Sequence, residues 1–305
     1  MSSLIALSKK PRVFQNHAMD STRWDTFRFR PDDIVVGTWA KTGTTLVQQI
    51  AGQLVFDGAD NVAIGEISPW LDLRIVPLQD VLALLEGQTH RRFVKTHLPF
   101  DALPLNERVR YIYVGRDVRD VIWSAHAHQM NFSPLAYELF NNTPGRIGPP
   151  LEPPHPNIHE YYRIWLERDG YPAWPFWSHV QSWWNARYLP NLMLVHFVNL
   201  KNDLEGEIRR IAGFLDITIK TESWPRIVEH CGFEYMKRHA DKAVGAGAAL
   251  FNTGSRDFIN KGTNGRWRDV LTPAEIARAD ECAAANLTAD CARWLATGEL
   301  PGLNG

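Results

Sequence analysis

One short stretch of the chain, residues 37–45, combines a lysine, two glycines and several threonines in the order Gly-Thr-Trp-Ala-Lys-Thr-Gly-Thr-Thr. It falls between an apolar strand pattern and a helix pattern. Backbone N–H groups at a helix start lack internal partners and the helix dipole adds positive potential, so such a loop suits an anion. The residues expected to contact the anion are Lys41, Thr42, Gly43, Thr44 and Thr45. The alternative is an ordinary helix capped by threonine with a solvated lysine.

The order of residues in this loop differs from the loop of ATPases. That pattern places lysine directly after the last glycine, followed by a Ser or Thr that holds Mg²⁺. Here Thr44 follows Gly43, and Lys41 precedes it. The order therefore indicates a phosphate-like group held without an obligatory metal, and the chain shows no HExxH pattern or carboxylate cluster suited to one.

Further candidates follow two other predicted strands. In Lys95-Thr96-His97-Leu98-Pro99, His97 is a candidate general base, because an imidazole accepts protons near neutral pH. The alternative is a histidine bonded to backbone in a turn. Arg116 follows the next strand, and a guanidinium suits a phosphate. Ser124 lies farther along the next helix, while Arg119 and Asp120 are interpreted as surface and capping residues.

A late glycine-rich loop carries Lys261 and Gly262, which offer a charge and bare N–H groups to an anion. By itself this is a weak signal.

Strand and helix patterns alternate along the chain, which predicts an α/β fold with a parallel sheet. Strands are expected at 34–38, 92–95, 109–114 and 192–198; helical spacing follows at 46–54, 118–125 and 204–215, and a helix start at Thr272-Pro273. Parallel sheets place ligands at the carboxyl ends of their strands, where the candidate residues lie. The proline-rich stretch 142–157 and the stretch 240–266, which lacks a usable period, are interpreted as functional loops of one domain, 1–305.

The composition limits the kinds of partner and the cellular compartment that we expect for this chain. Lys plus Arg number 33 against 34 Asp plus Glu, so no net field draws the chain to nucleic acid or an acidic membrane. Three cysteines fit neither a disulfide framework nor a CxxC metal site, which favours a reducing, cytoplasmic location. We see no signal peptide in residues 1–30 and no apolar run long enough to span a bilayer.

Taken together, these motifs resemble those of the cytosolic sulfotransferase family. Trp39 to Leu46 matches its Tyr-Pro-Lys-Ser-Gly-Thr-Thr-Trp loop, and Lys95 to Pro99 matches its Lys-Thr-His-Leu-Pro residue for residue. Arg116 and Ser124 have the family's spacing, and the stretch 260–267 matches Arg-Lys-Gly-x-x-Gly-x-Trp with Asn260 at the arginine. The resemblance runs from about residue 20 to about residue 275, in the same order.

The resemblance implies a kinase-like parallel sheet flanked by helices, and a donor, 3′-phosphoadenosine 5′-phosphosulfate (PAPS). It assigns Lys41 to Thr45 to the 5′-phosphosulfate and His97 to the acceptor's proton. Because charge grows on the leaving phosphate during sulfuryl transfer, we expect Lys41 at the bridging oxygen and that phosphate, and Lys95 at the sulfonate oxygens. The resemblance also assigns the 3′-phosphate to Arg116, Ser124, Lys261 and Gly262, and the adenine to Phe197 and Phe233. Ser124 is also expected to restrain Lys41.

The chain departs from the family pattern at several positions. Leu46 replaces a tryptophan that packs on adenine, Ala40 replaces a proline and Asn260 replaces an arginine. The family's dimer motif is degraded at Arg268, Thr272-Pro273 and Ala277, so we do not carry that dimer over and leave the oligomeric state open.

We therefore predict a sulfotransferase that acts on a hydroxyl or amine of a small, apolar or aromatic acceptor. Phe100, Leu103 and part of the aromatic stretch 155–188 are expected to wall the acceptor pocket, while His126, His128 and His159 are expected on the surface or in packing. The alternatives are an ATP-dependent small-molecule kinase and a PAPS-binding protein without catalysis.

Overall fold

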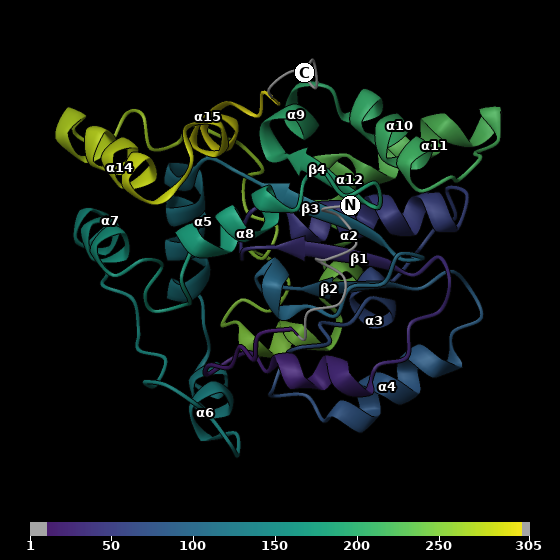
Figure 1. Ribbon diagram of the computed structural model, residues 1–305, viewed down its shortest axis with the longest axis horizontal. Helices are drawn as coiled ribbons and strands as arrows, with labels where there is room; N and C mark the ends of the chain where they lie inside the picture. The colour runs from purple at the N-terminus through teal and green to yellow at the C-terminus, as the bar shows by residue number, and fades with distance from the viewer. Residues whose placement is uncertain (1–10, 301–305) are drawn as a thin grey trace.

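A parallel sheet lies at the centre of the computed structural model, which describes residues 11–300 (Figure 1). Its order is β2-β1-β3-β4, formed by β1 (Ile34–Thr38), β2 (Phe93–Thr96), β3 (Arg110–Gly115) and β4 (Leu192–His196). Ile34 pairs with Phe93 on one side and with Arg110 on the other, so neighbouring strands begin level. The predicted parallel α/β fold is confirmed. Part of the amino-terminal stretch in which we see no signal peptide lies outside the described residues.

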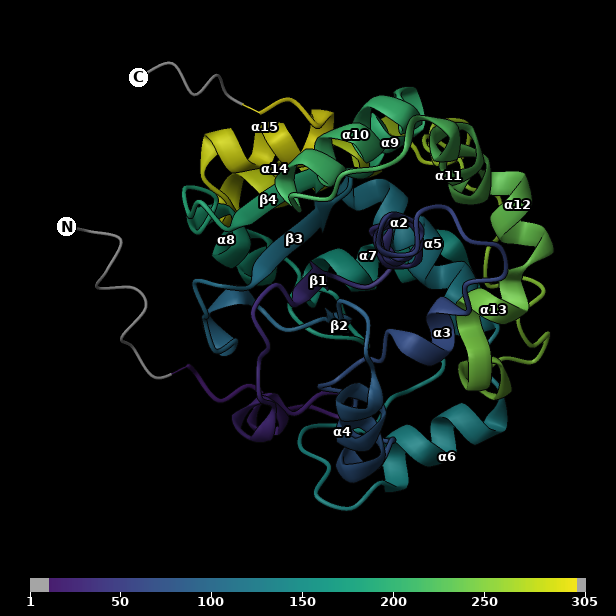
Figure 2. The ribbon, with the colours of Figure 1, turned by 90° about the vertical axis from the view of Figure 1, so that its right-hand side faces the viewer.

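Alternate residues of the strands face opposite layers of the core. Ile34 and Val36 pack with Ile50 and Ile208, so α2 (Thr44–Val55), α10 (Leu204–Phe214) and α11 (Trp224–Cys231) cover one face. Val35 belongs to the other cluster, which contains buried residues of α5 (Val118–Met130), α7 (Ile158–Glu167) and α8 (Trp177–Asn185). In Figure 2 the sheet has α8 on one side and α2, α10 and α11 on the other.

The remaining helices surround the carboxyl ends of the strands or pack at the periphery. They are η1 (Ser21–Thr26), α3 (Ile64–Ile67), α4 (Leu78–Gly87), η2 (Phe100–Ala102), α6 (Pro134–Asn142), α9 (Phe197–Asn202), η3 (Thr221–Ser223), α12 (Phe233–Arg238), α13 (Ala240–Val244), η4 (Gly245–Leu250), α14 (Pro273–Asn286) and α15 (Ala289–Thr297). None of the helices within residues 11–300 is long and apolar enough to cross a membrane.

Two predicted boundaries are wrong. The strand expected at 192–198 ends at His196, whose Nδ1 accepts a hydrogen bond from the Val198 N–H at 3.2 Å and caps α9. The stretch 240–266 is irregular only in its second part, because 240–250 forms α13 and η4. Alanine's high helix propensity favours helical structure there although no apolar stripe marks it. By contrast, Thr272 caps α14 in a capping box with Glu275, at the predicted start.

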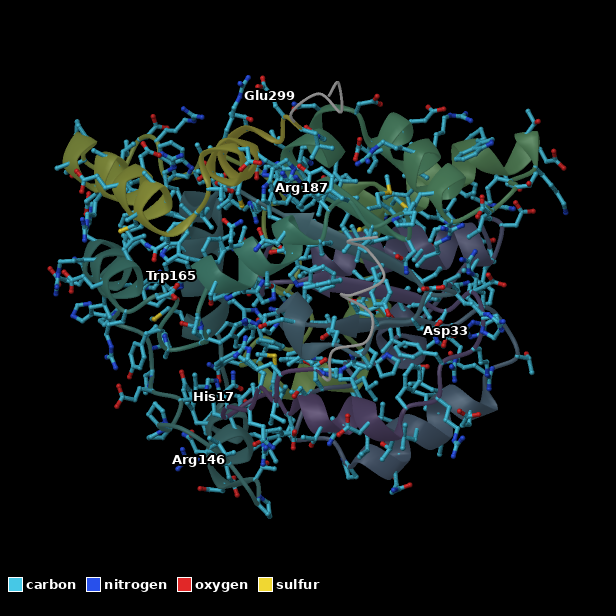
Figure 3. The ribbon with its side chains drawn as sticks, in the orientation of Figure 1. His17, Asp33, Arg146, Trp165, Arg187 and Glu299 are labelled. Atoms are coloured by element: carbon cyan, nitrogen blue, oxygen red, sulfur yellow. The ribbon has the colours of Figure 1, made fainter. Side chains whose placement is uncertain are left out.

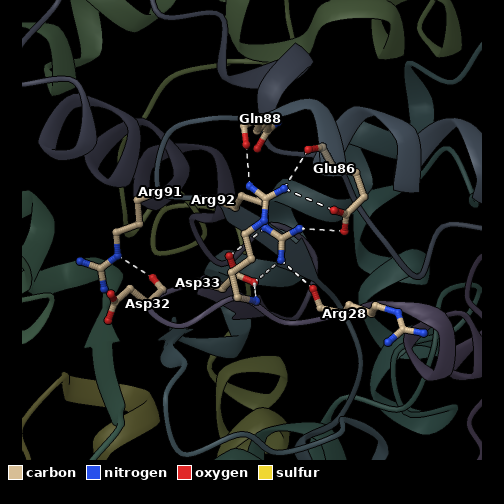
Figure 4. Close-up of polar contacts among 8 residues, drawn as sticks. Arg28, Asp32, Asp33, Glu86, Gln88, Arg91 and Arg92 are labelled. Carbon is tan, nitrogen blue, oxygen red and sulfur yellow. Dashed lines mark hydrogen bonds and ion pairs between the residues drawn. The ribbon is translucent and has the colours of Figure 1, made fainter.

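A buried ion pair joins the residues that precede β1 and β2 (Figure 4). It lies at the amino ends of these strands, whereas the candidate site lies at their carboxyl ends. The Arg92 guanidinium donates to the two carboxylate oxygens of Asp33 at 2.9 and 2.5 Å. It also donates to the carbonyl oxygen of Arg28 at 2.8 Å. Both side chains of the pair are excluded from solvent.

Candidate active site

The loop between β1 and α2 has the backbone form of an anion cradle. Lys41 and Gly43 both have positive φ, 70° and 123°, which turns successive N–H groups toward the helix start. A Cβ atom at Gly43 would lie 2.7 Å from the Phe197 ring, so only glycine fits there. The Thr44 and Thr38 hydroxyls are 2.7 Å apart and tie the helix start to the end of β1.

His97 lies at the carboxyl end of β2 and is oriented by the neighbouring strand. Its Nδ1 is 2.8 Å from the Thr38 carbonyl oxygen and 2.9 Å from the Thr38 hydroxyl. A carbonyl oxygen only accepts, so Nδ1 carries the proton and Nε2 keeps a free lone pair. Burial, followed by the Lys95 charge, lowers the pKa of His97 to about 3, so the neutral base persists across the physiological range.

Lys95 lines the same cavity, beside the segment that precedes α4. Its ammonium lies 5.9 Å from the centre of the Trp70 ring. Burial lowers the pKa of Lys95 to about 8, and the Asp72 charge opposes that shift. Asp72 itself accepts from the Trp70 indole at 2.6 Å and from the His97 backbone N–H at 3.4 Å.

Lys41 points toward α5, where its ammonium lies 3.2 Å from Nδ1 of His128. Burial, followed by Arg116 and Lys95, lowers the pKa of Lys41 to about 7. His128, expected on the surface or in packing, does pack against aromatic rings such as that of Phe132, but it also lines the cavity, which the sequence analysis did not predict. The i, i+4 relation between Ser124 and His128 places both on one face of α5, and that spacing is the signal that could have found His128. Ser124 also lines the cavity, and the contact with the Lys41 ammonium comes from His128.

Arg116 connects the phosphate loop to the late loop. Its guanidinium donates to the carbonyl oxygens of Lys41 at 3.1 Å and Thr263 at 3.2 Å, and to the Asn264 side chain at 3.2 Å. Those bonds use three of the five N–H groups of an arginine, which leaves two for an anion. The structure thus brings Arg116 within the same cavity as Lys261 and Gly262.

Two aromatic rings lie against glycines at this end of the cavity. Phe197 packs between Gly43 and the Arg116 guanidinium, whose carbon is 4.3 Å from the ring centre. Phe233 covers Gly262, where φ is +61° and a Cβ would lie 2.4 Å from the ring. Both rings line the cavity, and their assignment to the adenine stays a prediction.

A cavity of about 1170 Å³ joins all of these residues. Beyond His97 its walls come from the segment before α4, from α6 and from the stretch around η4. Aromatic and aliphatic side chains dominate there, among them Trp70, Leu73, Val76, Phe132, Leu139, Phe140, Trp174, Phe251 and Phe258. The volume lies just above the range of about 300–1,000 Å³ that is typical of pockets for one small molecule.

The predicted acceptor walls are mostly wrong. Of the tryptophans in the stretch 155–188, only Trp174 lines the cavity, and the others are buried in the core. Phe100 packs edge-on against Trp183, with ring centres 5.1 Å apart, and Leu103 is buried in the core cluster. The tight pairing of α8 with η2 uses these side chains for packing, so the walls come from remote segments.

Two charged residues also differ from the prediction. Arg119 and Asp120 are buried rather than exposed. Arg119 pairs with Asp117 at 2.8 Å and with Asp280 at 3.0 Å, which attaches α14 to α5. Asp120 accepts from the Gly265 N–H at 2.8 Å and anchors the late loop beside Arg116. His159 forms a half-exposed pair with Glu275, in accord with a packing role.

The sequence pattern of the sulfotransferase domain family matches residues 31–290. The chain belongs to the sulfotransferase family. This sulfotransferase is 32% identical over 289 residues to a glycolipid sulfotransferase of Mycobacterium bovis, covering 87% of this chain and 88% of that protein. It is 29% identical over 273 residues to sulfotransferase 1B1 of Mus musculus, covering 86% and 85%.

Solved structures show the same fold. A mouse sulfotransferase, SULT7A1, complexed with PAP superposes with a TM-score of 0.70 at 21% identity, covering 95% of this chain and 98% of that one. Retinol dehydratase in complex with androsterone and PAP superposes with a TM-score of 0.67 at 24% identity, covering 94% and 92%. The predicted fold class and the predicted enzyme family are confirmed.

Proposed function

We propose that this sulfotransferase moves a sulfuryl group from PAPS to a hydroxyl or amine of a small, apolar or aromatic acceptor. The observation that carries the proposal is the common orientation of Lys41, Lys95 and His97 into one cavity. His97 brings a neutral base with its Nε2 lone pair free, because Nδ1 is bonded to Thr38.

The proposed chemistry is an in-line displacement, which asks the protein for positioning and charge. As the hydroxyl oxygen of the acceptor molecule bonds to sulfur, its proton passes to Nε2 of His97. The bond between sulfur and the bridging oxygen breaks, and the electron pair remains on the leaving 5′-phosphate. Lys41 stabilises the charge on that phosphate, and Lys95 holds the sulfonate oxygens. A singly charged sulfonate needs less neutralisation than a terminal phosphate, so lysines serve where kinases use Mg²⁺.

The nucleotide part is assigned to the end of the cavity formed by Arg116 and the late loop. The two remaining N–H groups of Arg116, together with Ser124, Lys261 and Gly262, suit the 3′-phosphate. Phe197 and Phe233 offer rings to the adenine. Leu46 lines the same region and supplies an aliphatic face in place of an aromatic one.

The acceptor is assigned to the apolar remainder of the cavity beyond His97. A lipid-like alcohol agrees with two similar proteins, the glycolipid sulfotransferase of Mycobacterium bovis and retinol dehydratase, whose structure holds androsterone. The aromatic walls around Phe132 and Phe251 suit such molecules.

The deciding experiment incubates the protein with PAPS and a panel of phenols and alcohols, and follows 3′,5′-ADP and sulfated product. Transfer that survives EDTA supports the proposal, whereas transfer from ATP that requires Mg²⁺ favours a kinase. Binding of 3′,5′-ADP with no product from any acceptor favours a PAPS-binding protein without catalysis. Lys41→Ala is expected to impair both binding and turnover.

A further inference from the structure

A tight turn near the amino terminus presents one polar side chain to the cavity. Residues 15–20 form this turn, in which the Asn16 N–H donates to the Met19 carbonyl oxygen at 2.9 Å. The Asn16 side-chain oxygen accepts from the N–H groups of Ala18 and Met19 at 2.8 and 2.7 Å. His17 stands at the tip of the turn and lines the cavity.

The turn is attached to the segment that also shapes the reacting end. The Arg74 N–H donates to the Ala18 carbonyl oxygen at 2.8 Å, and the Asp20 N–H donates to the Asp72 carbonyl oxygen at 3.0 Å. Asp72 is the residue whose carboxylate holds the Trp70 indole, and the Trp70 ring centre lies 4.6 Å from that of His97. His17 is therefore fixed relative to the proposed base.

The His17 imidazole is buried without a polar partner. Only 6% of the residue is exposed, and neither ring nitrogen has a hydrogen-bond partner within residues 11–300. Burial, followed by the nearby Arg146 charge, lowers the pKa of His17 to about 4, so the ring is neutral and offers one N–H and one lone pair. Figure 3 shows His17 and Arg146 close together, away from the centre of the sheet. Neither ring nitrogen is among the solvent-excluded, unpaired polar atoms of residues 11–300, so both are open to the cavity, where a ligand or water can bond to them.

Aromatic contacts order the cavity from one end to the other. His128, beside Lys41, lies 5.2 Å from Phe132, measured between ring centres. Phe132 lies 6.1 Å from Phe140, and Phe140 lies 6.1 Å from His17 in an edge-on arrangement. His17 thus stands at the far end of an apolar wall that begins at the reacting groups.

We propose that His17 binds a polar group at the far end of the acceptor, so that the preferred substrates are elongated apolar alcohols with a second hydroxyl or a carbonyl group opposite the reacting hydroxyl. The inference rests on the proposed function and adds to it a substrate class. A neutral imidazole pairs with a neutral hydroxyl or carbonyl. The Arg146 guanidinium donates to the backbone carbonyl oxygens of Asn141 and Gly148, and Arg74 pairs with Asp20 at 3.5 Å. Both arginines beside the turn therefore already have partners within the protein.

The test compares primary alkanols with α,ω-diols of equal chain length, over a series of lengths, with PAPS as the donor. For the length that spans the cavity, wild-type kcat/KM is expected to favour the diol by about tenfold, because an unpaired buried polar group penalises the alkanol. In His17→Leu that ratio should fall to about two, the statistical factor for two equivalent hydroxyls. His17→Gln, which keeps a donor and an acceptor, should retain part of the preference.

His126→Leu is the matched control, because His126 does not line the cavity. Its diol preference should equal that of the wild type, and the affinity of every variant for 3′,5′-ADP should be unchanged. Equal ratios in His17→Leu and His126→Leu, or no preference at any length in the wild type, would overturn the proposal.

A binding assay separates this inference from the proposed function. Titration of tryptophan fluorescence with the same alkanols and diols reports through Trp70 and Trp174 in the cavity wall and needs no turnover. If no acceptor is sulfated, the proposed function fails, while the fluorescence titration still decides on His17. If diols bind more tightly than alkanols by the same factor in the wild type and in His17→Leu, the assignment of His17 is wrong, whatever the outcome for the proposed function.

Discussion

The Lys41 ammonium lies 3.2 Å from Nδ1 of His128, across the cavity from the loop that carries it. Burial lowers the pKa of the imidazole well below its usual value, so His128 stays neutral and acts only as the acceptor of this hydrogen bond. Before any phosphate binds, the charge of Lys41 therefore rests on a neutral partner. Burial, followed by the Arg116 and Lys95 charges, lowers the pKa of Lys41 to about 7, and a neutral imidazole brings no charge that would oppose this shift.

Binding of 3′,5′-ADP should take up a proton at alkaline pH. A phosphate stabilises the ammonium form of Lys41 and raises its pKa from about 7, so a largely neutral amine at pH 8 must be protonated as the ligand binds. The affinity should fall by up to about tenfold for each pH unit above 7. Calorimetry in buffers of different ionisation enthalpy measures the uptake. In Lys41→Arg the side chain is always charged, so the part of the proton uptake that comes from Lys41 should disappear. Equal proton uptake by the wild type and this variant at pH 8 would contradict this account.

His97→Ala should lose about 10²–10⁴-fold in turnover on an alcohol of high pKa, because proton removal by a placed base contributes that much. The affinity for 3′,5′-ADP should stay within a few-fold, since His97 is assigned to the acceptor. Steady-state kinetics and calorimetry measure the two effects. Near-normal turnover in the variant would remove His97 from the base role.

The pH profile offers a separate check on His97. Its pKa of about 3 means that the free protein holds it neutral from pH 5 upward, and protonation removes the base only in stronger acid. We expect kcat/KM for the acceptor to show no acid limb centred near the ordinary histidine pKa of about 6.5. A limb at that position which disappears in His97→Ala would show that the free imidazole has an ordinary pKa.

Asn260→Arg should tighten 3′,5′-ADP binding by about 0.5–1 kcal/mol, the range of an exposed ion pair. Asn260 lines the cavity beside Lys261 but is exposed, so solvent limits the gain. Asn202→Arg, on the exposed end of α9 outside the cavity, adds the same charge and serves as the control. Equal affinities for the two variants would show that the new guanidinium does not reach the phosphate.

Arg92→Met should lower the free energy of unfolding by about 3–5 kcal/mol, because it leaves the Asp33 carboxylate buried without its partner. Arg110→Met removes a partly exposed pair with Asp216 and should cost less than about 1 kcal/mol. Denaturant titration of both variants measures the difference. Similar losses would mean that the Arg92 pair contributes little beyond its packing.

The sequence predicts the site best where each function resides in a contiguous motif. Residues 37–45, 95–99 and 260–267 carry their own turn chemistry. The level start of the strands brings the first two stretches to the same end of the sheet, and bonds from Arg116 and Asp120 hold the third beside them. The sequence analysis did not predict His17 and Phe140 as cavity residues, because they meet only through the tertiary fold and no local period marks them. Phe197 illustrates a boundary error: a run of apolar residues from 192 onward reads as strand, while the capping bond of His196 starts a helix inside it.

Different chain segments form the two ends of the cavity, and this affects how the acceptor end could change without the other end. Lys41, His97 and Arg116 follow strands directly, so changes around them disturb the sheet. The wall from 132 to 151 lies in an excursion built on α6, which contributes no strand and lies at the margin of the molecule (Figure 1). That excursion can be exchanged for one of another length or polarity while the hydrogen bonds of the sheet stay intact. Under the proposed function, replacement of this segment would change the acceptor and leave the residues assigned to the donor in place.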